Sequence, residues 1–237
     1  MKAEQTSDSS LCGIEQHATL YALLVREAVA NFGVAGSKAA RDATSRYGRE
    51  RGARMAQKAI ANGDALTRPH YRLYKEWTPP EEGLMQSGVS QKTPTFITHQ
   101  FRCEWAESWK RHGLLDYGKL YCRYVDRYLC RGWSESYEVK ITSLLSEGDD
   151  KCTFDWGFEM TPEAEAELAR KSAEFGNRYI RNFDFHAGHL LYAMTREYAE
   201  QLGKEAGDAI RKAALTAFEE KFGKECSEAM QRAFPQG

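Results

Sequence analysis

Apolar residues recur at helical spacing near the start of the chain. One stripe at i, i+3 and i+4 predicts a buried helix face and consists of Leu20, Leu23, Leu24 and Ala28. The Gly-Val-Ala-Gly segment 33–36 interrupts this pattern, and an Ala- and Arg-rich helical pattern resumes over 38–61. Asn62-Gly63-Asp64 is a typical helix stop. We therefore predict two helical pieces between 14 and 61, preceded by a mobile tail at 1–14.

Apolar and polar residues alternate strictly in two arms separated by a turn. The arm 137–145 carries Tyr137, Val139 and Ile141, and the arm 151–158 carries Cys152, Phe154, Trp156 and Phe158. Period two on both arms predicts an antiparallel hairpin with one buried face. A second hairpin is predicted near 85–103, because Phe96-Ile97-Thr98 has strand-like composition.

Helical patterns occupy most of the remaining chain. A short helix with Trp105 and Trp109 one turn apart is expected to end near Gly113, and a longer helix over 116–131 is expected to end at Gly132. Thr161-Pro162-Glu163 then opens a helical C-terminal third, because proline suits the first helical position and acidic residues suit the first turn.

The C-terminal helical pattern reaches about residue 233 with an interruption at 182–188. The predicted fold is therefore α+β, with an antiparallel sheet, made of hairpins near 85–103 and 137–158, packed against helices. We expect residues 15–160 to form the core domain, and 161–237 to form a helical extension packed on that core.

Two helical segments of the chain resemble one another. Residues 26–43 align without gaps on 196–213, and six of the 18 positions are identical, including Gly33 with Gly203. Amphipathic helices rich in Ala, Arg and Glu can match through composition alone. The alternative is a pair of related helical hairpins that flank the sheet, although two copies do not make a repeat array.

Composition and charge exclude several classes of function. The 33 basic and 34 acidic residues give a net charge of -1, with no basic stripe of the kind that nucleic acids require. By this reading no apolar run approaches the ~20 residues of a membrane span, and the polar N-terminus lacks the apolar region of a secretory signal. We expect a cytoplasmic protein that binds a small molecule and neither nucleic acid nor membrane, with homo-oligomerisation left open.

The six cysteines are Cys12, Cys103, Cys122, Cys130, Cys152 and Cys226. A chain of this length does not need disulfides, and no CxxC motif is present, so we expect most of the thiols to be reduced and predict no metal and no cofactor. Each cysteine is by default a small buried apolar side chain.

The helix expected at 116–131 carries the strongest chemical candidates. Cys122 and Asp126 lie one turn apart beside its apolar stripe, with Lys119 and Arg123 nearby. Nearby cations would lower the pKa of the Cys122 thiol, and Asp126 could orient a base, hold water or bind an amidine nitrogen. A Cys and an Asp at this spacing are a common coincidence, and histidines such as His17 and His186 are more often structural.

The same region resembles the L-2-amino-thiazoline-4-carboxylic acid hydrolase family. The resemblance runs from His17 to Phe154, and its specific part lies between Cys103 and Asp126. The matching segments are Arg46-Tyr47-Gly48, Gly52-Ala53-Arg54-Met55-Ala56, Asn62-Gly63-Asp64, Trp77, Cys103-Glu104-Trp105, His112 to Gly118, Tyr121-Cys122 with Asp126, and Asp150 to Phe154.

The family resemblance implies hydrolytic opening of a cyclic isothiourea to give N-carbamoyl-L-cysteine. On this basis the catalytic candidates are Cys122, Asp126 and Cys103, although Cys152 also lies in the family pattern. The substrate-binding candidates are His17, Arg54, Trp105 and Arg123, because an arginine can bind a carboxylate through two hydrogen bonds.

Two alternatives to a cysteine-dependent hydrolase remain. The hairpin that ends in Asp-Asp-Lys-Cys-Thr-Phe, residues 149–154, also resembles 4-vinyl reductase-type small-molecule-binding domains, which implies a sensor or binding module with helices set against an antiparallel sheet. Separately, Cys103, Cys122 and Cys152 could meet a histidine at a zinc site, either structural or hydrolytic.

Overall fold

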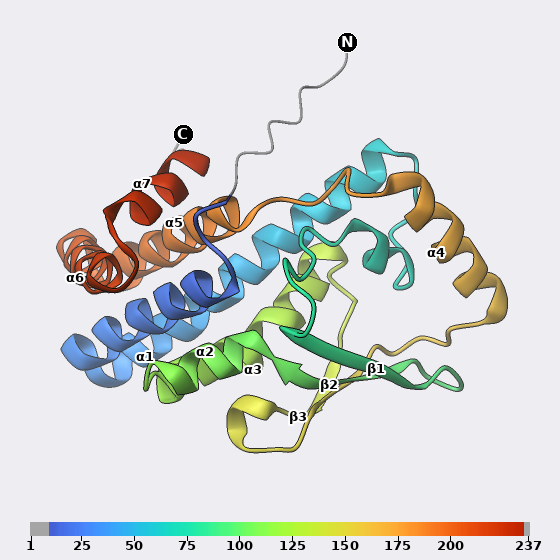
Figure 1. Cartoon of the computed structure of the whole chain (residues 1–237), viewed down its shortest axis with the longest axis horizontal. Helices are drawn as coiled ribbons and strands as arrows, with labels where there is room; N and C mark the ends of the chain where they lie inside the picture. The colour runs from blue at the N-terminus through green and yellow to red at the C-terminus, as the bar shows by residue number, and fades with distance from the viewer. Residues whose placement is uncertain (1–9, 235–237) are drawn as a thin grey trace, which may run out of the picture.

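The computed structural model describes residues 10–234 (Figure 1). Most of the predicted N-terminal tail, residues 1–9, lies outside this range. The first helix, α1 (Ile14–Ala61), starts directly after Gly13, whose backbone N–H donates to the side chain of Gln16. It ends at Asn62, as the Asn-Gly-Asp sequence predicted.

Helix α1 consists of two antiparallel arms, which confirms the prediction of two helical pieces. The chain reverses at Gly33, where φ is 53° and ψ is -123°. The Tyr21 and Thr44 hydroxyls on opposite arms lie 2.7 Å apart. A Cβ atom added at Gly36 would lie 2.0 Å from the carbonyl oxygen of Ala28, so the arms approach closely beside the turn.

The second helical hairpin is formed by α5 (Phe183–Leu202) and α6 (Lys204–Phe222), which are separated by Gly203 at a φ of 98°. Gly207 lies against Ala199, eight residues earlier, as Gly36 lies against Ala28. This shared geometry favours two related helical hairpins over mere similarity of composition. They pack on each other rather than on either side of the sheet, so that part of the expectation is wrong (Figure 1).

The C-terminal third also contains α4 (Pro162–Phe175) and α7 (Lys224–Ala233). The Thr161 side chain accepts a hydrogen bond from the Ala164 N–H, as expected of an N-cap. The interruption predicted at 182–188 is wrong, because the Asn182 side chain caps α5 and helix begins at Phe183. The break instead covers 176–182.

The four strands form one antiparallel sheet in the order β1-β2-β4-β3. They are β1 (Met85–Gln91), β2 (Ile97–Cys103), β3 (Lys140–Ser143) and β4 (Cys152–Asp155). Both predicted hairpins are confirmed. The second is shorter than its alternation suggested, because the chain enters a 3₁₀ turn, η2 (Leu145–Glu147), directly after β3. Cys152 and Phe154 lie two residues apart in β4 and so share a face.

Along the chain, η1 (His70–Tyr74) lies between α1 and β1, and α2 (Glu104–Arg111) and α3 (Leu115–Trp133) lie between β2 and β3. Both α2 and α3 contact α1. The backbone of α3 touches the backbone of the second arm of α1. A Cβ atom added at Gly52 of α1 would lie 2.0 Å from the Leu129 carbonyl oxygen of α3. Gly132, the expected end of α3, lies inside it against Arg49 of α1. Its lack of a side chain therefore serves packing.

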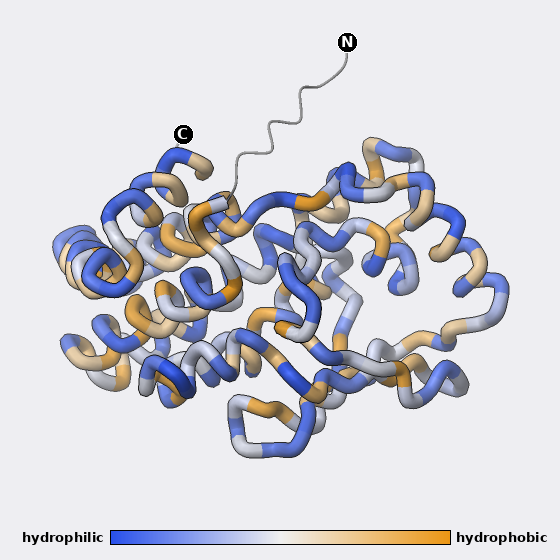
Figure 2. Tube along the Cα trace, in the orientation of Figure 1, coloured by the Kyte–Doolittle hydropathy of each residue, from blue (hydrophilic) through white to orange (hydrophobic). Residues whose placement is uncertain are grey.

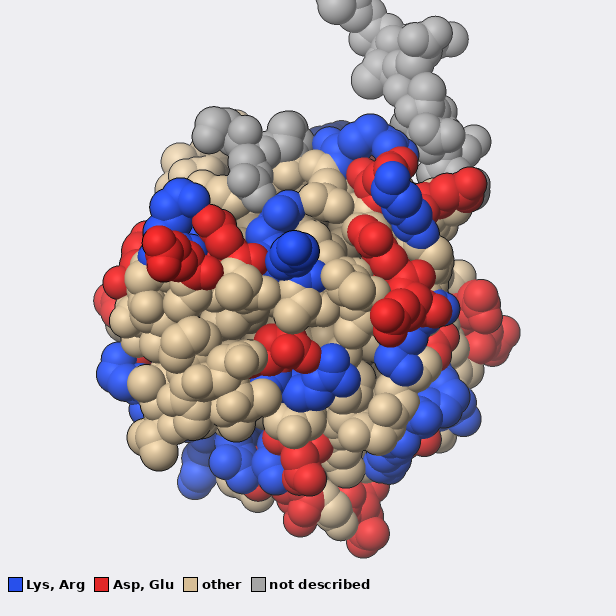
Figure 3. Space-filling model, turned by 90° about the vertical axis from the view of Figure 1, so that its left-hand side faces the viewer, with Lys and Arg blue, Asp and Glu red and all other residues tan. Residues whose placement is uncertain are grey.

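Apolar and polar residues alternate along the helices (Figure 2), and the buried apolar residues form two clusters. By length and composition, α1 contains a stretch that could span a membrane, and half of it is buried inside the protein. The expectation of no such stretch is therefore wrong by this measure, although the core helix of a folded domain has the same property. Basic and acidic side chains are interspersed over the face shown in Figure 3.

Candidate functional site

The inner side of α3 brings together the three residues that the sequence suggested for catalysis. Cys122 and Asp126 are half-buried on this helix, and Cys103 reaches them from the end of β2. The three groups lie close enough for the charge of each to affect the others, and Cys152 of β4 belongs to the same cluster. The fold therefore joins residues from α3, β2 and β4.

The cysteines of this cluster are not activated thiolates. Burial raises the pKa of Cys122 well above its ordinary value, and burial raises that of Cys103 to about 12. The lowering expected from Lys119 and Arg123 does not occur. Lys119 pairs with Asp116 at 2.8 Å, and Arg123 pairs with Glu147, so each cation is held by an acid on the surface.

Asp126 has an electrostatic environment of its own. Burial raises its pKa to about 6, while the guanidinium of Arg51 works in the opposite direction. Among the described residues, no hydrogen bond or ion pair reaches this carboxylate. At neutral pH Asp126 is therefore an ionised carboxylate, which is the state that a general base requires.

Arg51, on the second arm of α1, carries the matching positive charge. Only 5% of this residue is exposed, and its Nε has no hydrogen-bond partner among residues 10–234. The nearest carboxylate, that of Glu76, lies 3.8 Å from this Nε. A buried N–H donor without an acceptor is costly, so the position suits an anionic ligand. Arg51 is not among the residues predicted from the sequence.

Arg54, the arginine chosen from the sequence, is already occupied. Its guanidinium donates to both oxygens of the fully buried Glu76, at 3.2 and 2.9 Å, and also contacts His189 at 3.2 Å. Lys58 binds the same carboxylate at 2.9 Å. Burial opposes ionisation of Glu76, but Arg54, Arg51 and Lys58 lower its pKa to about 2. Arg54 thus stabilises the position of Glu76.

His17 and Trp105 form an adjoining wall. The Trp105 indole N–H donates to Nδ1 of His17 at 3.1 Å, so Nε2 carries the proton and donates to the Tyr47 hydroxyl at 2.9 Å. Burial lowers the pKa of His17 well below its ordinary value, which keeps the ring neutral. Tyr121 packs edge-on against His17, with ring centroids 5.8 Å apart.

Residues 13–156 match the model of the L-2-amino-thiazoline-4-carboxylic acid hydrolase family. The chain belongs to this family. The matched range spans α1 to β4 and continues to Trp156, so it includes Arg51, Cys103, Cys122 and Asp126. Searches of curated proteins and of solved structures find no match to the chain.

His186 reaches the same interior from α5, beyond the range that the family model matches. Its Nε2 lies 3.0 Å from the carbonyl oxygen of Glu76 and must donate to it, so Nδ1 is the unprotonated nitrogen. Within the part of the chain that the structure describes, this Nδ1 is buried without a partner, and burial lowers the pKa of the ring to about 3. His186 is therefore a free hydrogen-bond acceptor beside Arg51 and His17, whereas His189 is satisfied by Glu50 at 2.7 Å.

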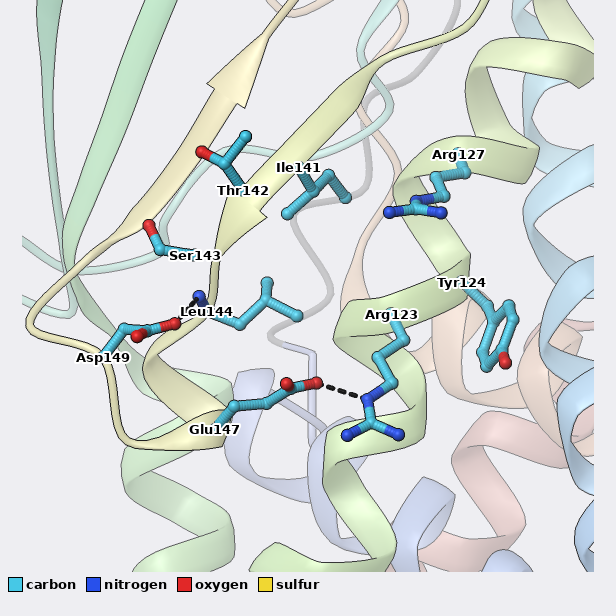
Figure 4. A pocket seen from close by; sticks show the side chains of 9 residues that line it. All are labelled: Arg123, Tyr124, Arg127, Ile141, Thr142, Ser143, Leu144, Glu147 and Asp149. Atoms are coloured by element: carbon cyan, nitrogen blue, oxygen red, sulfur yellow. Dashed lines mark hydrogen bonds and ion pairs between the residues drawn. The ribbon is translucent and has the colours of Figure 1, made fainter.

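Arg123, the last substrate-binding candidate, lies on the outer side of α3. It lines a surface pocket of about 300 Å³ between α3 and the segment 141–149, where its guanidinium is held by Glu147 (Figure 4). Arg127 lines the same pocket. Neither arginine belongs to the cluster of Cys122, Asp126 and Arg51.

The zinc alternative for this family member receives no support from residues 10–234. No group of three or more His, Cys, Asp or Glu side chains in that range is arranged to hold a metal ion. Cys103, Cys122 and Cys152 are close together, but they do not form a ligand set with a histidine.

Proposed function

We propose that the protein hydrolyses a small cyclic isothiourea or amidine that also carries a carboxylate, as 2-amino-thiazoline-4-carboxylate does. Family membership supports the class of reaction. The observation that carries the proposal is the pair of Arg51 and Asp126, two charges of opposite sign that influence each other although, among residues 10–234, no hydrogen bond or ion pair joins them.

Such a substrate complements both charges. Its carboxylate matches the guanidinium of Arg51, which presents a planar set of donors. Its protonated amidine matches Asp126, and Nδ1 of His186 can accept a further N–H. Because a buried polar group without a hydrogen-bond partner is costly, a ligand that accepts from Nε of Arg51 removes a penalty that the free protein carries.

The reaction consumes one water molecule. The water oxygen adds to the ring carbon that lies between nitrogen and sulfur, and Asp126 takes the proton. The bond between that carbon and sulfur then breaks, and the sulfur leaves as a thiolate. Protonated Asp126 is more acidic than an alkyl thiol, so it can pass its proton to the sulfur. The product is an N-carbamoyl amino acid with a free thiol.

Attack by Cys122 is the cysteine-dependent version of the same reaction. Because burial keeps this thiol protonated, it must first lose its proton to a base, and Asp126 stands one helical turn away. Cys122 would then form a covalent intermediate that water hydrolyses. Both routes depend on Asp126, whereas only the second depends on the sulfur of Cys122.

A substrate pair tests the charge complementarity. The wild-type protein should open 2-amino-thiazoline-4-carboxylate faster than 2-amino-thiazoline, which lacks the carboxylate. Arg51→Gln should lower kcat/KM for the first compound by about 10- to 100-fold, the value of a charged hydrogen bond, and should change the second little. Arg127→Gln is the matched control, because Arg127 lies on the outer side of α3.

The opposite result has a clear meaning. Wild-type protein that binds these compounds and never opens the ring would be a binding module. Equal losses for both compounds in Arg51→Gln would show that Arg51 does not bind the carboxylate.

A further inference from the structure

Two cysteines far apart in the sequence meet at the ends of the fold. Cys12 precedes α1 and Cys226 lies in α7, 214 positions later, yet their Sγ atoms are 2.8 Å apart. Both side chains are buried, at 4% and 5% exposure. They lie apart from the cluster of Cys103, Cys122 and Cys152, and the proposed hydrolysis does not use them.

The protein holds this contact in place from both sides. The Cys12 backbone N–H donates to Oδ1 of Asp184 at 2.7 Å, and the Leu11 N–H donates to Oδ2 at 3.3 Å. The Cys226 thiol also lies 3.6 Å from the carbonyl oxygen of Leu11. The segment before α1 is therefore fixed against the start of α5 and against α7.

We propose that Cys12 and Cys226 are a disulfide-forming pair that links the two ends of the chain in response to oxidants such as hydrogen peroxide. The two sulfur atoms are already closer than two non-bonded thiols normally pack. Bond formation therefore needs only a small movement of the side chains, in line with the short reach of a disulfide.

The two thiols are suited to different steps. The hydrogen bond from the Cys12 thiol lowers the pKa of Cys226. The Cys226 thiolate attacks one peroxide oxygen, breaks the O–O bond and becomes a sulfenic acid, while the other oxygen leaves as water after taking a proton. Cys12 then attacks the Cys226 sulfur and releases a second water. Two thiols are oxidised and one peroxide is reduced.

The disulfide would close a loop of more than 200 residues around both helical hairpins. Such a loop removes much of the freedom of the unfolded chain, and for a protein of this size the expected rise in Tm is about 5–15 °C. The bond would also fix the residue next to Gly13, which precedes the turn of α1 that carries His17.

Peptide mapping of the wild-type full-length protein is the deciding experiment. After treatment with hydrogen peroxide, non-reducing digestion and mass spectrometry should show a peptide pair joined through Cys12 and Cys226, and dithiothreitol should release it. Persistence of both residues as free thiols, or a disulfide formed only among other cysteines, would overturn the proposal. The mapping needs no substrate, so its result is independent of the proposed hydrolysis.

Variants add a thermal readout. Oxidation should raise the Tm of the wild type and of Cys130→Ser, a control at another buried cysteine, and reduction should reverse the rise. Cys12→Ser and Cys226→Ser should each lose this shift. An oxidant-dependent rise that survives in either variant would contradict the pairing.

Discussion

The guanidinium of Arg51 lowers the pKa of the Asp126 carboxyl group, yet no hydrogen bond or ion pair joins these two side chains within the described residues. Arg51 lies on α1 and Asp126 on α3, and the backbones of these helices touch at Gly52. The packing therefore fixes the two charges at a distance, and the account of function depends on that arrangement.

Asp126→Asn should stabilise the protein at neutral pH. The pKa of Asp126 is raised from 3.8 to about 6, so between these values the native state binds more protons than the unfolded state. This residue therefore lowers the free energy of unfolding as pH rises through that window. At about pH 8 the variant should gain about 1–3 kcal/mol over the wild type.

Denaturant unfolding at about pH 8 and about pH 4.5 measures this difference, which should shrink at the lower pH as Asp126 becomes protonated. A variant whose stability matches the wild type at both pH values would show that the carboxylate is well solvated.

Cys122 should react slowly with alkylating agents at neutral pH, because burial raises its pKa and leaves little thiolate. Labelling by iodoacetamide, followed by mass spectrometry, should be slower than for free cysteine and should accelerate as pH rises. This expectation replaces the one from sequence, in which neighbouring cations lowered the pKa of the Cys122 thiol.

Cys122→Ser separates the two routes of hydrolysis. If water attacks directly, the variant should retain most of its turnover; if Cys122 attacks, turnover should fall by roughly 10²-fold or more while Tm changes by only a few degrees. Cys130→Ser, at another position on α3, is the control. The cysteine-dependent route fails if Cys122→Ser turns over substrate at the wild-type rate.

Gly52→Ala should destabilise the protein by about 1–3 kcal/mol, because the new Cβ atom would overlap the carbonyl oxygen of Leu129. Gln57→Ala, an exposed change on the same arm of α1, should stay within about 0.5 kcal/mol. Thermal unfolding of both variants checks the prediction. If Gly52→Ala is as stable as the control, the close approach of α1 and α3 is not as described.

Local sequence patterns predicted much of the fold. The alternation around Val139 and Phe154 identified the second hairpin, and the glycines near Gly33 identified the turn within α1, since these signals depend on neighbours in the chain. Gly132 was misread as a helix end, because a glycine that permits contact with another helix looks the same in sequence as one that ends a helix. The likeness to 4-vinyl reductase-type domains stays a prediction.

The candidate site was only partly predictable. Cys122 and Asp126 share one helix, so their proximity followed from spacing. The choice between Arg51 and Arg54 could not be made from spacing. It depends on Glu76, a loop residue whose carboxylate accepts hydrogen bonds from Arg54. His186 comes from a helix that sequence spacing could not place beside α1 and α3. Tertiary contacts alone decide which polar groups remain unpaired.

The most direct test of the account is the pH dependence of ring opening of 2-amino-thiazoline-4-carboxylate, followed by mass spectrometry for wild type and Asp126→Asn. We expect wild-type kcat/KM to fall below about pH 6, as Asp126 takes up a proton, and we expect Asp126→Asn to lose roughly 10²- to 10⁴-fold at about pH 8. Undiminished turnover by a folded Asp126→Asn protein would contradict the assignment of Asp126 as the base.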